Sequence, residues 1–244
     1  MKIRLLSMLF LLLQGSLGGY AQTSDQSKIN NTHFFSFAPG LRTNGFGINL
    51  KWGSATNPSR FYYYTIDFGK IKHKKEFRYL GNGRYNGFVF GRKNVFMPLH
   101  FGIGDYRILG VRNSKNDVGV ACTYQAGVSM ALLKPVYLYV DEKPGTLNSS
   151  EVLVKYNGER NVDLSNILGG APFFTGINQI TMVPGAFGKA SLLFSWGKYY
   201  RDYHVLELGF LAEAYTRTLP LMANTSNNFI YPSFFINFNM GKFW

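Results

Sequence analysis

The sequence predicts an all-β protein, a transmembrane antiparallel up-and-down β-barrel of about eight strands (ten is the alternative count) that follows a cleaved signal peptide. Several stretches alternate apolar with small or polar residues, which is the period of a strand between two different environments. Aromatic residues make up 17% of the 244 residues and glycines number 27, a composition that favours strands and tight turns over helices. The last alternating stretch ends on Trp244, and a terminal aromatic is typical of the closing strand of an outer-membrane barrel.

Residues 1–21 have the pattern of an export signal. Lys2 and Arg4 precede an apolar segment at 5–13, and the small residues Gly19 and Ala21 occupy the −3 and −1 positions of a cleavage site. The apolar segment is too short for a membrane-spanning helix. Polar residues 22–32 are expected to be a disordered lead-in, so the barrel is predicted to occupy 33–244.

The expected strands follow one another in chain order. They span about 34–42, 46–52, 61–69, 95–109, 118–132, 183–196, 206–215 and 229–244. The first is the weakest because Pro39 interrupts it, and the Asn44-Gly45 pair after it is a strong hairpin signal. A change of phase near Gly104 predicts a bulge, and the fifth strand has an optional extension to Val140.

The polarity of the two faces separates a membrane barrel from a soluble sandwich or a lipocalin-like barrel. Between 118 and 132 the less apolar face carries glycine, alanine, threonine, glutamine and serine, which is too little charge for a solvated surface. The other face is aliphatic and aromatic, as lipid requires. Long connections at 70–94, 141–182 and 220–228 alternate with short ones, which predicts the bacterial outer membrane with a periplasmic C-terminus.

A polar network is expected inside the barrel, because the inward positions of five strands carry ionisable residues. Its predicted members are Lys51, Asp67, His100, Lys189, Glu207 and Glu213. We interpret them as a salt-bridged plug, since buried charges need partners and an eight-stranded lumen is narrow. The alternatives are a narrow pore, or a hydrolase or acyltransferase acting on lipid A or phospholipid through a carboxylate–histidine pair. No serine is expected beside that histidine and an acid, so no catalytic residue is assigned. The other histidines lack metal-ligand spacing, and neither a metal nor a cofactor is predicted.

Basic residues cluster after the third strand, where lipid A phosphates lie if this end faces outward. The candidate phosphate contacts are Lys70, Lys72, Lys74, Lys75 and Arg78. The alternative is a solvated loop end. Loop 141–182 contains many apolar residues, which indicates either packing over the barrel mouth or docking of another envelope protein. Nucleic acid is excluded as a partner by the export signal.

The outward row of the closing strand is expected to be the signal that barrel-assembly machinery recognises during insertion. It consists of Phe234, Ile236, Phe238, Met240 and Trp244.

Four segments, 43–47, 67–69, 132–138 and 239–244, together with the signal, resemble a family of small outer-membrane β-barrel proteins of Bacteroidota-type bacteria. The resemblance implies a location and a fold. At that location, outer-membrane lipid and lipopolysaccharide are the expected contacts. Some barrels of this kind are accessory subunits of larger envelope machines for barrel assembly or protein secretion, so the expected function is structural or accessory and not enzymatic.

Overall fold

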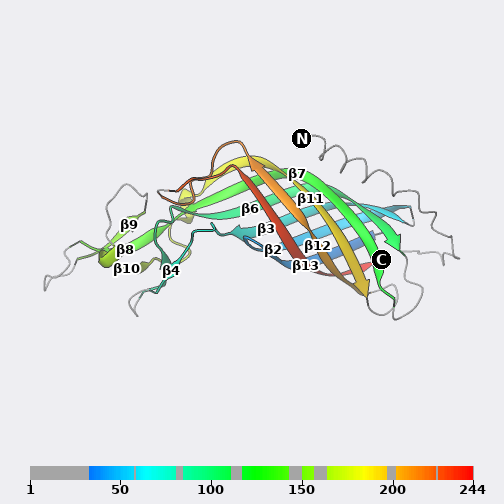
Figure 1. The fold of residues 1–244 in the computed structure, drawn as a ribbon, viewed down its shortest axis with the longest axis horizontal. Coiled ribbons are helices and arrows are strands. Elements are labelled where there is room, and N and C mark those ends of the chain that lie inside the picture. The colour runs from blue at the N-terminus through cyan, green and yellow to red at the C-terminus, as the bar shows by residue number, and fades with distance from the viewer. Residues whose placement is uncertain are drawn as a thin grey trace, which may run out of the picture. The chain divides into compact units, whose positions relative to one another are not determined.

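A computed structural model describes residues 33–57, 59–80, 85–110, 117–142, 150–156, 164–196, 202–223 and 225–243. The predicted signal peptide and lead-in lie outside these residues. The described chain forms a closed antiparallel β-barrel of eight strands (Figure 1). The barrel strands are β1 (His33–Arg42), β2 (Gly45–Asn57), β3 (Arg60–Ile71), β6 (Asn94–Gly110), β7 (Gly119–Pro135), β11 (Thr181–Trp196), β12 (Asp202–Tyr215) and β13 (Ile230–Phe243).

Each barrel strand pairs with its neighbours in the chain, and β1 closes the sheet by pairing with both β2 and β13. The prediction of about eight strands is thereby confirmed. The first strand is regular despite Pro39, which sits opposite Ile48 in the β1–β2 ladder and faces outward.

The predicted alternation of faces is present in the barrel wall. On β13, Phe234 and Ile236 are 66% and 53% exposed, whereas Phe235 and Asn239 are 4% and 0% exposed. The barrel therefore has an apolar outside and a filled inside, the reverse of a soluble barrel.

Two details differ from the sequence prediction. The irregularity in β6 lies between Ile108 and Gly110, and Gly104 is in regular register with Gln125. The fifth strand ends at Pro135, and Tyr137–Asp141 (β8) belongs to a separate sheet. The alternation looks shifted in phase near Gly104 because Asp105 and Arg107 occupy outward positions, where Asp105 pairs with Arg60 and Arg107, while Tyr106 between them packs against the inner clusters.

The two long connections are also more ordered than predicted. Residues 72–93 include the two-stranded sheet of β4 (Arg78–Tyr79) and β5 (Phe88–Val89). Beyond β7, β8 pairs with β9 (Glu151–Lys155) and β10 (Ile167–Gly170), and two short 3₁₀ helices, η1 (Leu164–Asn166) and η2 (Ile177–Gln179), complete the segment. Loop 141–182 is thus part of a small three-stranded sheet.

Connection lengths divide the barrel into two ends. The long-loop end carries 43–44, 72–93, 136–180 and 216–229, and the short-turn end carries 58–59, 111–118 and 197–201. In the part of the chain that is described, no helix has the length and apolar character needed to cross a membrane.

Candidate functional site in the barrel lumen

The lumen is filled in three layers, an apolar one at each end and a polar one between them. At the long-loop end an apolar cluster, here the cap, combines strand residues with three residues of the β12–β13 loop. Its members are Ile71, Phe96, Ala131, Leu133, Val183, Tyr215, Leu219, Leu221, Met222 and Tyr231. Leu219 and Leu221 are 0% and 2% exposed, so this loop folds inward over the barrel mouth.

Backbone hydrogen bonds hold the cap in place. The carbonyl oxygen of Leu221 accepts bonds from the backbone of Lys93 at 2.9 Å and of Asn94 at 3.4 Å, and Ala223 N–H donates to Gly91 at 2.7 Å. The Asn227 side chain accepts from the N–H groups of Leu221 and Met222 at 2.9 and 3.2 Å. The inward loop is therefore fastened to the chain that enters β6.

Aromatic residues close the short-turn end from inside. Phe34, Phe61 and Tyr63 are 2–4% exposed and pack edge to face, with Phe34 5.9 to 6.0 Å from the other two rings. Tyr106 packs against this cluster and also against Ala121, Leu193 and Val205. Buried apolar side chains therefore lie at both ends of the polar layer.

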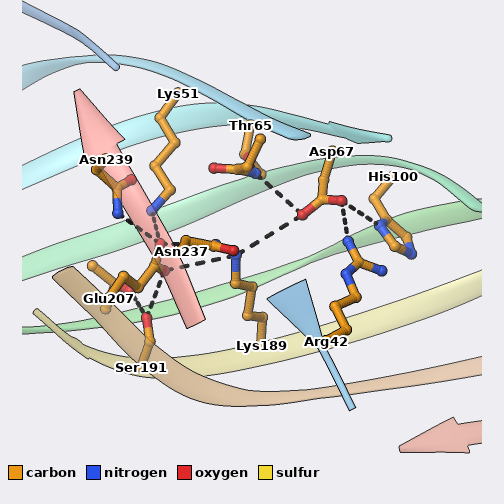
Figure 2. A network of polar contacts seen from close by, with 12 residues as sticks. Arg42, Lys51, Thr65, Asp67, His100, Lys189, Ser191, Glu207, Asn237 and Asn239 are labelled. Carbon is orange, nitrogen blue, oxygen red and sulfur yellow. Dashed lines mark hydrogen bonds and ion pairs between the residues drawn. The ribbon is translucent and has the colours of Figure 1, made fainter. Parts of the chain in front are cut away.

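Glu207 on β12 is one centre of the polar layer (Figure 2). Its carboxylate accepts hydrogen bonds from Lys51 Nζ at 2.8 Å, Ser191 Oγ at 2.8 Å, Asn237 Nδ2 at 3.2 Å and Asn239 Nδ2 at 3.1 Å. Glu207 is fully buried. Four donors from three strands compensate the desolvation of this charge.

Arg42 on β1 is the second centre. Its guanidinium donates to Asp67 through one terminal nitrogen and to Glu213, at 3.2 Å, through the other. Glu213 also accepts from Tyr215 Oη at 2.8 Å. Lys189 lies between the two centres, with Nζ 3.9 Å from Asp67 and 3.6 Å from a Glu207 oxygen.

His100 is buried between two carboxylates. Its Nδ1 lies 3.5 Å from Asp67 and its Nε2 lies 3.3 Å from Glu213. Neither ring nitrogen makes a hydrogen bond of good geometry, and the ring packs 4.7 Å from that of Phe187.

We call Arg42, Lys51, Asp67, His100, Lys189, Glu207 and Glu213 the lumen network. All seven are at most 9% exposed. Apart from His100, the network contains the cations Arg42, Lys51 and Lys189 and an equal number of carboxylates, so these charges balance one another.

The structure brings together all six residues that the sequence predicted for the lumen. Arg42, which bridges two of the carboxylates, was missed. Arg42 is an even number of residues from Ser36 and Ala38 and therefore shares their inward face on β1, which was a usable signal. Pro39 made the strand look interrupted, so this alternation was not extended to Arg42. Asn237 and Asn239 on β13 also join the network, through their hydrogen bonds to Glu207.

One negative expectation is wrong. No serine was expected beside His100, yet the β6–β7 register places Ser129 directly opposite it. Ser129 Oγ lies 2.7 Å from Tyr215 Oη, which in turn donates to Glu213. The serine and the histidine are 3% and 0% exposed, so this group lies under the cap and not at a rim that meets substrate. The sequence missed the pair because cross-strand register depends on the turn and bulge between β6 and β7.

The basic residues predicted for phosphate contact lie at the long-loop end. Lys72, Lys74, Lys75 and Arg78 are exposed and Lys70 is half-buried. Lys74 and Lys75 form a turn, whereas Lys72 and Arg78 lie within electrostatic range of Lys70.

Two further cations join Lys70. Arg92 interacts with Lys70, and Lys134 interacts with both. Arg92 also pairs with Glu76. We call Lys70, Lys72, Arg78, Arg92 and Lys134 the basic rim. The residues in these interactions are five cations and one carboxylate, Glu76, so the rim carries excess positive charge.

The outward row of β13 lies on the wall as predicted. Phe234, Ile236, Phe238 and Met240 are 37–66% exposed, and Trp244 lies outside the described residues. Within the described ranges, no group of three or more histidine, cysteine, aspartate or glutamate residues is arranged to hold a metal ion.

Comparison with known proteins does not assign the chain to a family. No protein-family model matches the chain, and no curated protein matches it. Among solved structures, the chain is similar to Neisserial surface protein A, at 10% sequence identity and a TM-score of 0.36 over 86% of this chain and 92% of that one. A likeness at this level carries no functional argument, and the barrel assignment rests on the strand pairing described above.

Proposed function

We propose that this protein is a non-enzymatic barrel of the bacterial outer membrane with a plugged lumen, acting as a structural or accessory subunit of a larger envelope machine for barrel assembly or protein secretion. The observation that carries the proposal is the charge-balanced lumen network sealed by apolar layers at both ends. Such an interior stabilises a fold, and its apolar ends favour a plugged lumen over a substrate site or an ion path. The remaining surfaces are the wall and the long loops.

The wall supports the membrane position. Outward side chains such as Ile103, Val128 and Phe234 are 63–66% exposed, a pattern that water disfavours and hydrocarbon favours. The difference in loop length between the two ends supports a periplasmic short-turn end, which also holds the C-terminus of β13.

The basic rim supports contact with lipopolysaccharide. In the proposed orientation the rim faces outward, where lipid A phosphates lie. Charge-assisted contacts from lysine and arginine are the usual way to bind phosphate.

The small β8–β9–β10 sheet supports a protein partner. Phe174 is 78% exposed in the segment after β10, and Leu153 on the edge strand β9 is 44% exposed. Exposed apolar side chains on an ordered loop domain are typical of an interaction surface.

Purification of the tagged chain from outer membranes in mild detergent tests this proposal. We expect a larger envelope protein to be recovered in stoichiometric amount, and to be lost when Phe173 and Phe174 are replaced by serine. The matched control replaces Lys74 and Lys75 by glutamine, a change on another loop of the same end. A clean monomer that carries no partner would contradict the accessory role.

Planar-bilayer recording tests the plug. We expect no single-channel conductance from the wild-type barrel, because the cap, the lumen network and the aromatic cluster of Phe34, Phe61 and Tyr63 follow one another along the lumen. Steady conductance in the wild-type protein would instead support the pore alternative.

A further inference from the structure

The outer wall carries a groove that no part of the proposed function uses. It encloses about 730 Å³, within the usual range for ligand sites, and is lined by residues of β1, β2, β3, β6 and β7 in the half of the barrel nearest the short turns. The shape of the groove follows from the strand register. Residues paired across neighbouring strands form rows, and three adjacent rows make the two sides and the floor of the groove.

Tall side chains form the two walls. One row joins Trp52, Tyr64 and Ile103 across the strands, and the outward faces of these residues are 40%, 59% and 65% exposed. The parallel row contains Tyr62 and Tyr124, which are 46% and 56% exposed. The rows are two residues apart along each strand, or about 7 Å, which accommodates one hydrocarbon chain.

The floor between these rows is backbone. It belongs to the inward row in which Gly53, Tyr63 and Gly104 are paired. A side chain on Gly104 would lie 2.3 Å from the Tyr63 ring, and one on Gly53 would lie 2.6 Å from Tyr63 Cβ. The two glycines thus let the Tyr63 ring lie flat against the inside of the wall. The wall groove is therefore backed by a packed aromatic ring.

Paired guanidinium groups lie at the short-turn edge of the groove. Asp105 lines the groove and accepts from Arg60 at 2.8 and 2.9 Å and from Arg107 at 2.7 Å. Arg60 also stacks 4.7 Å above the Tyr62 ring. Two arginines share one carboxylate, so this edge keeps a net positive charge and free donor positions for a phosphate.

We propose that the wall groove binds a phospholipid of the periplasmic leaflet, with an acyl chain between the aromatic rows and the phosphate on Arg60 and Arg107. The commitment to phospholipid follows from this combination of an apolar slot with an adjacent cationic edge. The site rests on the membrane position proposed above and adds a specific lipid to it.

Photolabelling of the full-length protein, purified from membranes, tests the site. The protein is reconstituted in phosphatidylethanolamine vesicles containing a minor fraction of phosphatidylglycerol with a diazirine on one acyl chain, and labelled peptides are mapped by mass spectrometry. We expect labelling to concentrate on the segments around Tyr64, Ile103 and Tyr124. Filling the groove with Ala126→Trp should reduce that labelling several-fold.

The matched control is Val128→Trp, two residues along the same strand and also outward, which should leave the labelling unchanged. Replacing both Arg60 and Arg107 by glutamine should also reduce labelling several-fold. Even labelling around the whole barrel, or equal labelling in the two tryptophan variants, would overturn the groove and leave the membrane position intact. No labelling anywhere, with loss of heat-modifiable gel mobility, would overturn both.

Discussion

The lumen network and the basic rim contain similar residues and differ in charge balance. In the lumen, Arg42, Lys51 and Lys189 face three carboxylates, and all of these groups are buried. In the rim, Glu76 pairs with Arg92 and also acts on Lys70; Lys72 and Arg78 are exposed, whereas Lys134 is only 4% exposed. Charges that balance within the chain contribute to the fold, whereas an unbalanced excess on the surface is available for an external anion. The four predictions below test this distinction, from the largest expected effect to the smallest.

Glu207→Gln should be the most damaging single change. It leaves Lys51 and Lys189 facing a neutral amide in a sealed interior, and breaking a buried pair in this way costs about 3–5 kcal/mol. Denaturant unfolding in lipid vesicles measures the loss in free energy of unfolding. Adding Lys51→Met should recover part of it, because one uncompensated charge is then removed. A loss below about 1 kcal/mol would show that the network is not structural.

Arg42→Lys should lower stability by about 2 kcal/mol although the charge is kept, since an ammonium group cannot reproduce a guanidinium that spans Asp67 and Glu213. The same unfolding measurement applies. Arg107→Lys, at an exposed position, is the control and should be nearly neutral. Equal stability of the Arg42 variant and the wild type would mean that the bridge contributes nothing.

Ser129→Ala should cost about 1 kcal/mol, the value of one buried hydrogen bond. Mass spectrometry of lipid A and phospholipids should find the same species in cells carrying wild-type and variant protein. A modified lipid that disappears in the variant would reveal a catalytic role for the Ser129–His100 pair and contradict the non-enzymatic proposal.

Replacing Lys70 and Lys72 together by glutamine should change stability least, by less than about 0.5 kcal/mol, as is usual for surface substitutions. The amount of lipopolysaccharide that copurifies with the barrel should fall, because the rim loses two of its five cations. The control pair is Lys74 and Lys75, which lie in the adjacent turn. If both pairs reduce lipopolysaccharide equally, general charge and not the rim explains the binding.

Most of the fold could be predicted from the alternation of apolar with small or polar residues. This two-residue period is visible wherever one face of a strand meets lipid and the other meets a packed lumen. It also placed the lumen residues, since parity fixes which side chains point inward. Parity failed for Arg42 only because the proline made its strand look interrupted, although an outward proline on a regular strand leaves the inward parity unchanged.

Cross-strand register and loop structure were harder to predict. The pairing of His100 with Ser129 depends on a bulge between Ile108 and Gly110, whose position the outward charged residues Asp105 and Arg107 obscured. The β8–β9–β10 sheet is built from strands of four or five residues, too short to show a sustained period. Arg92 and Lys134 join the rim through the folding of distant segments, for which the sequence carries no local signal.

The seam between β1 and β13 has a consequence for assembly. Arg42 and Lys51 come from the first hairpin, while Glu207 and Glu213 come from the penultimate strand. Until the barrel closes, Lys51 lacks Glu207 and Arg42 lacks Glu213, although Asp67 on β3 belongs to the same early part of the chain as Arg42. A slip of two residues at the seam keeps every side chain on its own face and displaces Arg42 by about 7 Å relative to Glu213, which breaks that ion pair and leaves the pair with Asp67. The buried ion pairs across the seam therefore favour the native register of barrel closure over registers that are shifted by two residues.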